Sequence, residues 1–270
     1  MAWVPGKTFL VGSNSKIASA NERPAHKVSA HGFWMGTTDV TTAERKPDWD
    51  TIRVQLPAGT SRQPDSALVP GAMVFIGTNA PVRLDQYWRW WRFVPGANWC
   101  HPKGPDSNID GEGDYPVAQI SYEDAPAYAK WVGKHLPTEA EWELAARGGP
   151  EQADYVWGNE LAPGGKKQAS CWDAKQGAFP VVESETNVGA PGTPPARTFP
   201  ASAYGLYDMT GNVWNGARIG TGHFVQQAEK VAQGAAFRDP VGPLDSYDPS
   251  DPETPADASE QGDSRRVVSV

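Results

Sequence analysis

Residues 136–149 read Leu-Pro-Thr-Glu-Ala-Glu-Trp-Glu-Leu-Ala-Ala-Arg-Gly-Gly, and this stretch carries the clearest structural signal in the chain. Thr138 is a good helix N-cap, and Glu141 stands three residues later, where its carboxylate can close a capping box. Arg147 complements the helix dipole, and the two glycines that follow are typical helix terminators. The stretch therefore predicts a well-capped helix, and the cap alone stabilises it by about 1 kcal/mol.

Working outward, four stretches predict short β-structure. Residues 3–12 alternate apolar and turn residues and are interpreted as a hairpin. Residues 26–29 and 32–35 are two further strand candidates, and residues 72–76 form a short apolar run within a Pro-rich region. These elements are short and are separated by turn-forming residues, so no long regular layer is expected.

A second helix is expected to begin at Ser121, a good N-cap, and to end near Gly133. Its apolar stripe includes Trp131, and Pro126 has to lie in the first turns, because deeper in the helix it would remove a hydrogen bond.

Residues 87–93 read Tyr-Trp-Arg-Trp-Trp-Arg-Phe, a run that we expect to be buried with arginines stacked on the rings. Interleaved Arg and Trp can also bind single-stranded nucleic acid, but the acidic balance of the chain disfavours that reading.

The composition favours a mixed, loop-rich α+β domain. The chain has 270 residues, of which 28 are Gly and 25 are Pro. Because Gly and Pro interrupt helices and strands, this content argues against a helical bundle. The net charge of −8 makes nucleic acid an unfavourable partner, because phosphate binding needs a basic face.

The sequence predicts a cytoplasmic protein without a membrane segment. No apolar run approaches a membrane span, and residues 1–5 lack the basic start and apolar stretch of a signal peptide. Cys100 and Cys171 sit in no metal or redox spacing, so two free thiols in a reducing compartment are expected.

A second distinctive stretch lies at residues 204–214, which read Tyr-Gly-Leu-Tyr-Asp-Met-Thr-Gly-Asn-Val-Trp. This stretch and residues 136–149 resemble the two signatures of the formylglycine-generating enzyme (sulfatase-modifying factor) superfamily. Weaker matches lie at residues 5–13, 22–26, 99–109 and 114–117. Together they run in the family's order from Trp3 to Trp214.

This resemblance implies the α+β formylglycine-generating enzyme fold, which is related to C-type lectin folds. The family's best-known members oxidise a cysteine of a sulfatase to formylglycine, using oxygen and a copper ion held by two cysteine thiolates. Thiolates are soft ligands that suit cuprous copper. Calcium ions brace the loops, and a sulfatase is the implied protein partner.

The resemblance also implies a calcium site in the second signature. Its ligand positions map onto Asp208, Gly211, Val213 and Asn215. Asn215 replaces a glutamate, which leaves the site one charge short and weakens calcium binding. Asp208 alternatively serves as a turn residue. A second family calcium site would begin at Ser170 and is regarded as lost.

The implied copper site is expected to be missing. The family's catalytic cysteines follow a segment whose beginning resembles residues 265–268, but the printed sequence ends at Val270. Cys100 and Cys171 match family positions that other residues normally hold. The chain is therefore expected to be inactive, with residues 1–249 as a domain lacking its catalytic segment and residues 250–270 as an acidic, disordered tail.

Two places suggest damage to the reading frame. Deleting one nucleotide from the family's codons after Trp214 reproduces residues 215–222, which supports a frameshift. After Val40 the family places an amphipathic helix, and its four or so large apolar side chains would each contribute about 1.5–3 kcal/mol. Without that helix, poor folding is expected.

Three functions compete. The first is an oxidoreductase family member without its catalytic end, and the second is a non-catalytic, lectin-like binding module. The third is an iron-dependent sulfoxide synthase relative, which would need a histidine triad. The five histidines show no such cluster; they are His26, His31, His101, His135 and His223.

Overall fold

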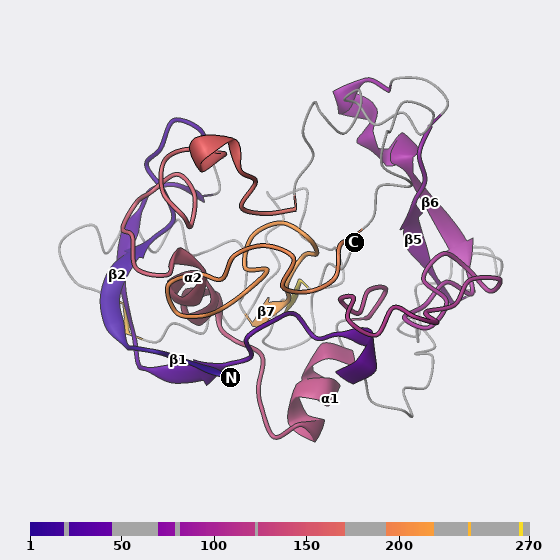
Figure 1. The fold of residues 1–270 in the computed structure, drawn as a ribbon, viewed down its shortest axis with the longest axis horizontal. Coiled ribbons are helices and arrows are strands. Elements are labelled where there is room, and N and C mark those ends of the chain that lie inside the picture. Colours follow the sequence, from indigo (N-terminus) through magenta and orange to yellow (C-terminus); the bar gives the residue numbers. More distant parts are fainter. Residues whose placement is uncertain are drawn as a thin grey trace, which may run out of the picture.

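The computed structural model describes residues 1–18, 22–44, 70–78, 82–121, 124–170, 193–218, 237–238 and 265–266. In this part, two α-helices stand among short strands, 3-10 turns and long loops (Figure 1). The helices are α1 (Asp124–Trp131) and α2 (Glu139–Arg147). The strands are β1 (Ala2–Val4), β2 (Lys7–Val11), β3 (His26–Ala30), β4 (Phe33–Met35), β5 (Gly71–Phe75), β6 (Trp91–Pro95), β7 (Ala217–Arg218), β8 (Phe237–Arg238) and β9 (Arg265–Arg266). The mixed, loop-rich α+β class predicted from composition is confirmed.

The hairpin predicted over residues 3–12 is wrong in its pairing. Strand β1 pairs antiparallel with β4, and β2 pairs antiparallel with β3. The physical reason is a double bend, at Gly6 in one chain segment and at Gly32 in the other. A Cβ on Gly6 would meet the backbone nitrogen of Gly32 at 2.5 Å, so the two bends lie against each other. The two pairs share one register, so residues 2–11 and 26–35 form a single antiparallel ribbon that is interrupted at these glycines.

The remaining strands form small separate pairs. Strands β5 and β6 are antiparallel, with Gly71 opposite Pro95 and Phe75 opposite Trp91. This pair lies on the far side of the molecule from β2 and α2 (Figure 1). Strand β8 extends the β2–β3 pair in parallel, and β9 pairs with β7. The strand predicted over residues 72–76 is confirmed within one residue.

Helix α2 matches its prediction at both ends. The Thr138 hydroxyl accepts the Glu141 N–H at 3.2 Å, and Glu141 Oε2 accepts the Thr138 N–H at 2.8 Å. Gly148 follows in a left-handed conformation with φ of 60°, as a helix-ending glycine does. Both halves of the capping box are therefore present, and the helix begins and ends where its sequence specifies.

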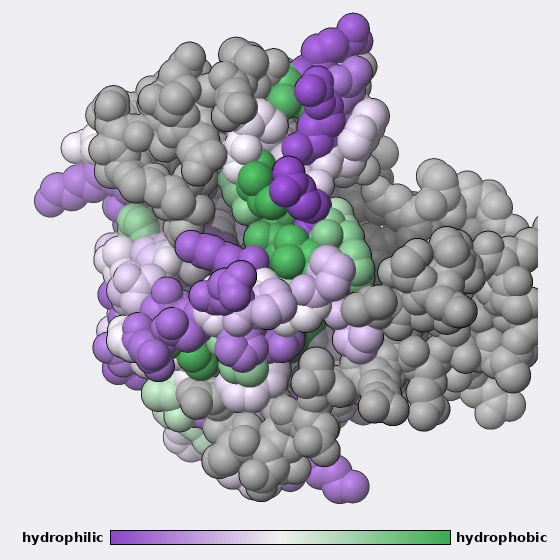
Figure 2. Space-filling model, turned by 90° about the vertical axis from the view of Figure 1, so that its right-hand side faces the viewer, coloured by the Kyte–Doolittle hydropathy of each residue, from purple (hydrophilic) through white to green (hydrophobic). Residues whose placement is uncertain are grey.

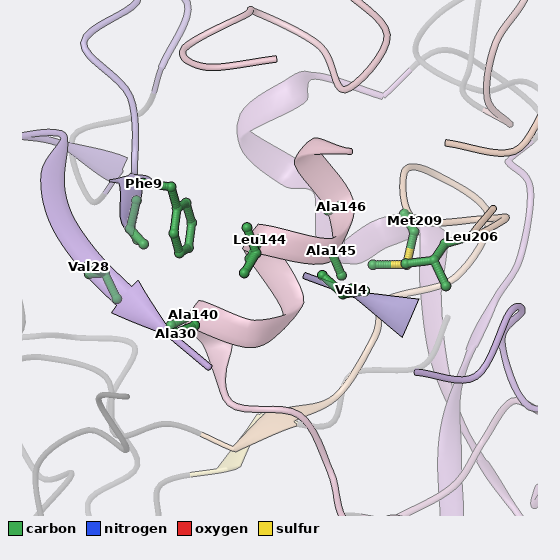
Figure 3. Packing of buried hydrophobic residues seen from close by; sticks show 11 residues of the cluster. Val4, Phe9, Val28, Ala30, Ala140, Leu144, Ala145, Ala146, Leu206 and Met209 are labelled. Atoms are coloured by element: carbon green, nitrogen blue, oxygen red, sulfur yellow. The ribbon is translucent and has the colours of Figure 1, made fainter. Parts of the chain in front are cut away.

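One face of α2 packs in the core between the strands and residues 204–214, which we call the signature loop. Leu144 is fully buried and points toward Phe9, while Ala145 lies beside Val4 (Figure 3). On the other side of the helix, Leu206 joins the same cluster. The other core members are Val11, Val28, Ala30, Ala140, Ala146 and Met209. Small side chains on α2 allow the helix to approach its neighbours closely.

A polar clamp joins the end of α2 to the end of β2. The Glu143 carboxylate accepts the N–H of Gly12 at 2.9 Å and receives the Arg147 guanidinium at 2.5 Å. Arg147 Nη2 also donates to the Gly12 carbonyl at 2.7 Å. Both backbone groups of Gly12 are thus satisfied by side chains of one helix, which fixes the distance between helix and strand.

The predicted N-cap of α1, Ser121, makes the hydrogen bonds of a helix cap with Asp124, the first described residue of the helix. The Ser121 hydroxyl accepts the Asp124 N–H at 3.3 Å, and Asp124 accepts the Ser121 N–H at 2.7 Å. Pro126 lies in the first turn, as its missing N–H requires. Trp131, predicted to lie on the buried stripe, is 53% exposed, so that detail is wrong. The helix is only eight residues long, and Trp131 stands at its last position.

The aromatic run at residues 87–93 is only partly buried, which corrects the expectation that all its rings are. Trp90 is buried, whereas Trp88 and Phe93 are 56% and 43% exposed. The reason is that β5 and β6 form a two-stranded ribbon, and Phe93 faces its cross-strand neighbour Met73 on the open side. Figure 2 shows apolar side chains, in green, gathered in the middle of this side of the molecule.

The segment after Val40 is held by the middle of the chain. The Val40 carbonyl accepts the Val117 N–H at 2.8 Å, and Thr42 N donates to the Tyr115 carbonyl at 2.9 Å. A 3-10 turn, Thr42–Glu44, follows, and residues 45–69 lie outside the described residues. Of the predicted tail at 250–270, the structure describes Arg265–Arg266 alone, paired with β7, so the domain boundary stays a prediction.

No helical segment in the described part of the chain combines the length and the apolar character that crossing a membrane requires.

Replacing Leu144 with alanine tests the core. Because Leu144 is fully buried, we expect the free energy of unfolding to fall by about 2–5 kcal/mol in urea titrations. Leu161 is 58% exposed and is the matched control, since Leu161→Ala should change that free energy by less than about 0.5 kcal/mol. Equal effects of the two substitutions would contradict the placement of the core around α2.

Candidate functional site

The second signature folds into a loop of left-handed residues. Asp208, Gly211 and Asn212 have φ values of 57°, 75° and 64°. Asp and Asn tolerate this conformation better than other non-glycine residues, and glycine adopts it without strain. The sequence of this loop therefore suits its tight course, which aims the Asp208 side chain into the protein.

Gly211 is required by a close neighbour as well as by its φ angle. A Cβ at Gly211 would overlap the carbonyl oxygen of Ser170, with which the loop forms a parallel bridge. The N–H of Asn212 donates to the same carbonyl at 3.1 Å. Ser170, the first position of the family calcium site regarded as lost, thus serves as a backbone support for the other site.

The Asp208 carboxylate is buried and anchored through one oxygen. Asp208 Oδ2 accepts the Arg197 N–H at 2.9 Å, and the residue is 8% exposed. Burial raises the pKa of Asp208, while the hydrogen bond from the Arg197 backbone and the charge of its guanidinium lower it. The Arg197 guanidinium lies 5.5 Å from the centre of the Tyr207 ring, which keeps it beside the loop.

Asn215 connects three distant segments through its amide. Trp142 Nε1, on α2, donates to Asn215 Oδ1 at 3.2 Å. Asn215 Nδ2 donates to Asp39 Oδ1 at 3.1 Å and to the Val213 carbonyl at 3.2 Å. Because an indole N–H can only donate, the amide oxygen has to face Trp142 and the amide hydrogens have to face Asp39 and Val213.

Asp39 is a site residue that sequence reasoning missed. It lies between β4 and the turn Thr42–Glu44, and its Oδ2 is buried with no hydrogen-bond partner. Burial raises the pKa of Asp39 to about 7, the Asp208 carboxylate adds to the rise, and the Asn215 hydrogen bond opposes it. The two acids are far apart in sequence, and no local spacing links them.

The predicted calcium ligands fit a cation only in part. Of the predicted ligands, the Asp208 carboxylate suits a hard cation; Asp39, whose Oδ2 has no hydrogen-bond partner, was not among them. The Val213 carbonyl accepts an N–H from the Asn215 side chain through one of its two lone pairs, and the Asn215 amide turns its hydrogens toward Val213 and Asp39. Among the described residues, no group of three or more His, Cys, Asp and Glu side chains is arranged to hold a metal.

The described residues do not bring two thiolates together. Cys100 lies in a turn organised by Asn98, whose Oδ1 accepts from the Cys100 backbone N–H and thiol, both at 2.9 Å. Cys171 lies outside the described residues. The donor set of a two-thiolate copper site is therefore not met in the described part of the chain.

A groove of about 570 Å³ opens beside Asp39 and Asn215. Its walls include Trp34, Trp214 and Arg197. Trp34 and Trp214 are 61% and 67% exposed, so two large aromatic surfaces are available at the rim. Trp34 is packed against Trp3, with ring centres 5.5 Å apart.

Comparison with known proteins identifies the family. Residues 1–261 match the sulfatase-modifying factor enzyme 1-like domain, so the chain belongs to the formylglycine-generating (sulfatase-modifying factor) family. It is 44% identical over 218 residues to the formylglycine-generating enzyme of Mycobacterium tuberculosis, covering 78% of this chain and 71% of that protein. It is 37% identical over 218 residues to the enzyme of Mus musculus, covering 79% of this chain and 56% of that protein.

The family also contains proteins described as inactive. The chain is 33% identical over 245 residues to inactive C-alpha-formylglycine-generating enzyme 2 of Mus musculus, covering 88% of this chain and 74% of that protein. Membership therefore fixes the family without fixing the activity of this chain.

Replacing Gly211 with alanine tests the loop geometry. Gly205 is the matched control, because it has the same φ of 75° but open space where a Cβ would stand. Gly205→Ala should cost only the left-handed strain of about 1–2 kcal/mol. Gly211→Ala should cost about 1–3 kcal/mol more, because the methyl group displaces Ser170. Equal costs in chemical unfolding would argue against the contact with Ser170.

Proposed function

We propose that this chain binds a cysteine-containing segment of a sulfatase and that, with the cysteines of its 270 residues, it does not oxidise that segment. Family membership supports the partner, and the cysteine inventory supports the inactivity. The main observation in favour of inactivity is that the Cys100 thiol donates a hydrogen bond to Asn98 Oδ1 within a tight turn. Its only possible thiolate partner in the printed sequence is Cys171.

The chemistry of the family explains why this inventory matters. Copper bound by a thiolate pair supplies the oxidation, and soft sulfur ligands are what cuprous copper prefers. In this chain, Asn98 Oδ1 accepts from the backbone N–H groups of both Cys100 and His101, at 2.9 and 3.0 Å. Cys100 thus belongs to a structural turn, and its own thiol completes the hydrogen bonding of that turn.

We propose calcium as the metal of this protein, at the loop that carries Asp208, Gly211, Val213 and Asn215. The buried Asp208 carboxylate is the strongest support, since oxygen ligands of this kind suit calcium. Calcium here would brace the loop and take no part in oxidation.

We also propose a compartment and domain bounds for this chain. The cytoplasm is the proposed compartment, because two cysteines without disulfide spacing favour reducing conditions. Residues 1–249 are the proposed domain and residues 250–270 the proposed tail.

The groove beside Asp39 is the proposed surface for the bound segment. Exposed tryptophans are the side chains that most often dominate binding energy at protein interfaces. Trp34 and Trp214 provide two of them at one rim, and Arg197 adds a positive charge to the lining in a protein whose net charge is −8.

A non-catalytic, lectin-like module with a different partner is the second candidate. The match to an inactive mouse relative is the observation that favours it. The two candidates differ in what they bind, since only the first requires recognition of a sulfatase peptide.

The test combines binding with product analysis. The chain, supplied with cuprous ion in air, is mixed with a fluorescent sulfatase peptide that contains the target cysteine. We expect saturable binding by fluorescence anisotropy and no aldehyde by mass spectrometry, both unchanged in Cys100→Ser. Aldehyde formation that Cys100→Ser abolishes would overturn the assignment of inactivity.

Substitutions at the groove test the binding surface. Trp34→Ala and Trp214→Ala should each raise the Kd for the peptide about tenfold, because each removes a large exposed contact surface. Trp88→Ala is the control, because Trp88 is also exposed, at 56%, but does not line the groove. Absence of any peptide binding would leave the second candidate as the function.

A further inference from the structure

We propose that Asn215 is a positioning residue of the groove: its side-chain amide fixes the backbone around Trp214 and so sets the direction of that exposed ring for the bound peptide. This inference rests on the peptide binding proposed above, and it adds the residue that governs one of the two aromatic contacts. It uses the hydrogen bonds of Asn215 as the structure shows them and needs no bound ion.

One hydrogen bond of Asn215 spans Trp214. Asn215 Nδ2 donates to the carbonyl of Val213, two residues earlier, at 3.2 Å. The bond closes a short ring that contains both backbone torsions of Trp214, as local hydrogen bonds from asparagine to the backbone do. The direction in which Trp214 leaves the chain is therefore restricted.

The other two hydrogen bonds attach this ring to distant parts of the protein. Trp142 Nε1, on α2, donates to Asn215 Oδ1 at 3.2 Å from a position 73 residues away. Asn215 Nδ2 donates to Asp39 Oδ1 at 3.1 Å, across 176 residues of sequence. Trp142 and Asp39 line the same groove. The backbone that carries Trp214 is thus held by a core helix and by another part of the groove wall.

Trp214 benefits from this support because little of its ring is packed. The residue is 67% exposed. A side chain on a loose backbone loses conformational freedom when a ligand orders it, and a backbone that is already fixed reduces this cost. Trp34, by comparison, is packed against Trp3, with ring centres 5.5 Å apart. The two tryptophans of the rim are therefore held by different means.

Asparagine suits this place because its three partners require one acceptor and two donors. The Trp142 indole can only donate, whereas Asp39 Oδ1 and the Val213 carbonyl accept. An ionised carboxylate at position 215 would have no hydrogen for either acceptor. Leucine has a similar size, no charge and no hydrogen-bonding group, so Asn215→Leu removes all three bonds and little else.

The groove wall has attachments that do not involve Asn215. The Thr37 carbonyl accepts the Tyr207 N–H at 2.8 Å, and the Val40 carbonyl accepts the Val117 N–H at 2.8 Å. Both bonds remain in Asn215→Leu. We therefore expect that variant to fold and its effect to be concentrated at Trp214.

A double-mutant cycle on peptide binding tests this role. Asn215→Leu should raise the Kd for the fluorescent sulfatase peptide about 2–10-fold, at a temperature where circular dichroism shows every variant folded. In a Trp214→Ala background the same substitution should change the Kd by less than about 1.5-fold, because the ring that Asn215 positions is already gone. In a Trp34→Ala background it should keep its full effect, since Trp34 packs against Trp3.

Asn108→Leu is the matched control for this cycle. The Asn108 side chain accepts the Asp110 N–H at 3.0 Å and does not line the groove, so the Kd should be unchanged. An Asn215→Leu effect of equal size with and without the Trp214 ring would overturn the positioning role, because independent losses add.

Fluorine NMR of the chain labelled with fluorotryptophan tests the positioning without peptide. Trp142→Phe keeps an aromatic ring and deletes the indole N–H that donates to Asn215. It should move the Trp214 resonance, assigned with Trp214→Phe, by more than its line width. Trp157→Phe is the control and should leave that resonance in place, because it deletes an indole hydrogen bond, to the Glu160 carbonyl at 2.8 Å, outside the groove.

The two measurements distinguish this inference from the proposed function. A wild-type chain that binds no peptide would remove the proposed function, and the fluorine spectra would then decide the role of Asn215 by themselves. An unchanged Trp214 resonance in Trp142→Phe would overturn the inference even if the peptide binds.

Discussion

The burial of one short helix is the constraint on which the rest of the described structure depends. Helix α2 places Leu144 and three alanines against β1, β2, β3 and the signature loop, and small side chains let all of them come close. Its other faces carry the Arg147–Glu143 clamp to Gly12 and the Trp142 indole that meets Asn215. A nine-residue helix thus fixes the core, the strand end and the candidate metal site together.

The loop around Asn215 illustrates how one amide can change local electrostatics. A glutamate at position 215 would contribute a negative oxygen, whereas Asn215 contributes hydrogens that bind Asp39 and the Val213 carbonyl. The Asp39 carboxylate that accepts this hydrogen bond lies in the segment after β4, far from Asn215 in the sequence. The loop itself turns through left-handed residues at Asp208 and Gly211.

Short sequence patterns predicted individual helices and strands correctly, but they did not predict which strands pair. The caps of α2 and the strand at β5 both follow from residues within a few positions of one another. The pairing of β1 with β4 does not, because a bend at Gly6 is visible only beside the bend at Gly32. Asp39 was missed for the same reason, and the exposure of Phe93 depends on what covers a two-stranded ribbon, which periodicity does not encode.

The close approach of Gly6 and Gly32 limits which substitutions this sequence can accept. A methyl group on Gly6 would press on the backbone of Gly32, and one on Gly32 would press on the ring of Trp3. That ring in turn packs on Trp34 at the rim of the groove. Substitutions at Gly6 and Gly32 are therefore coupled to each other, and through Trp3 they are coupled to the edge of the groove, although neither glycine lines it.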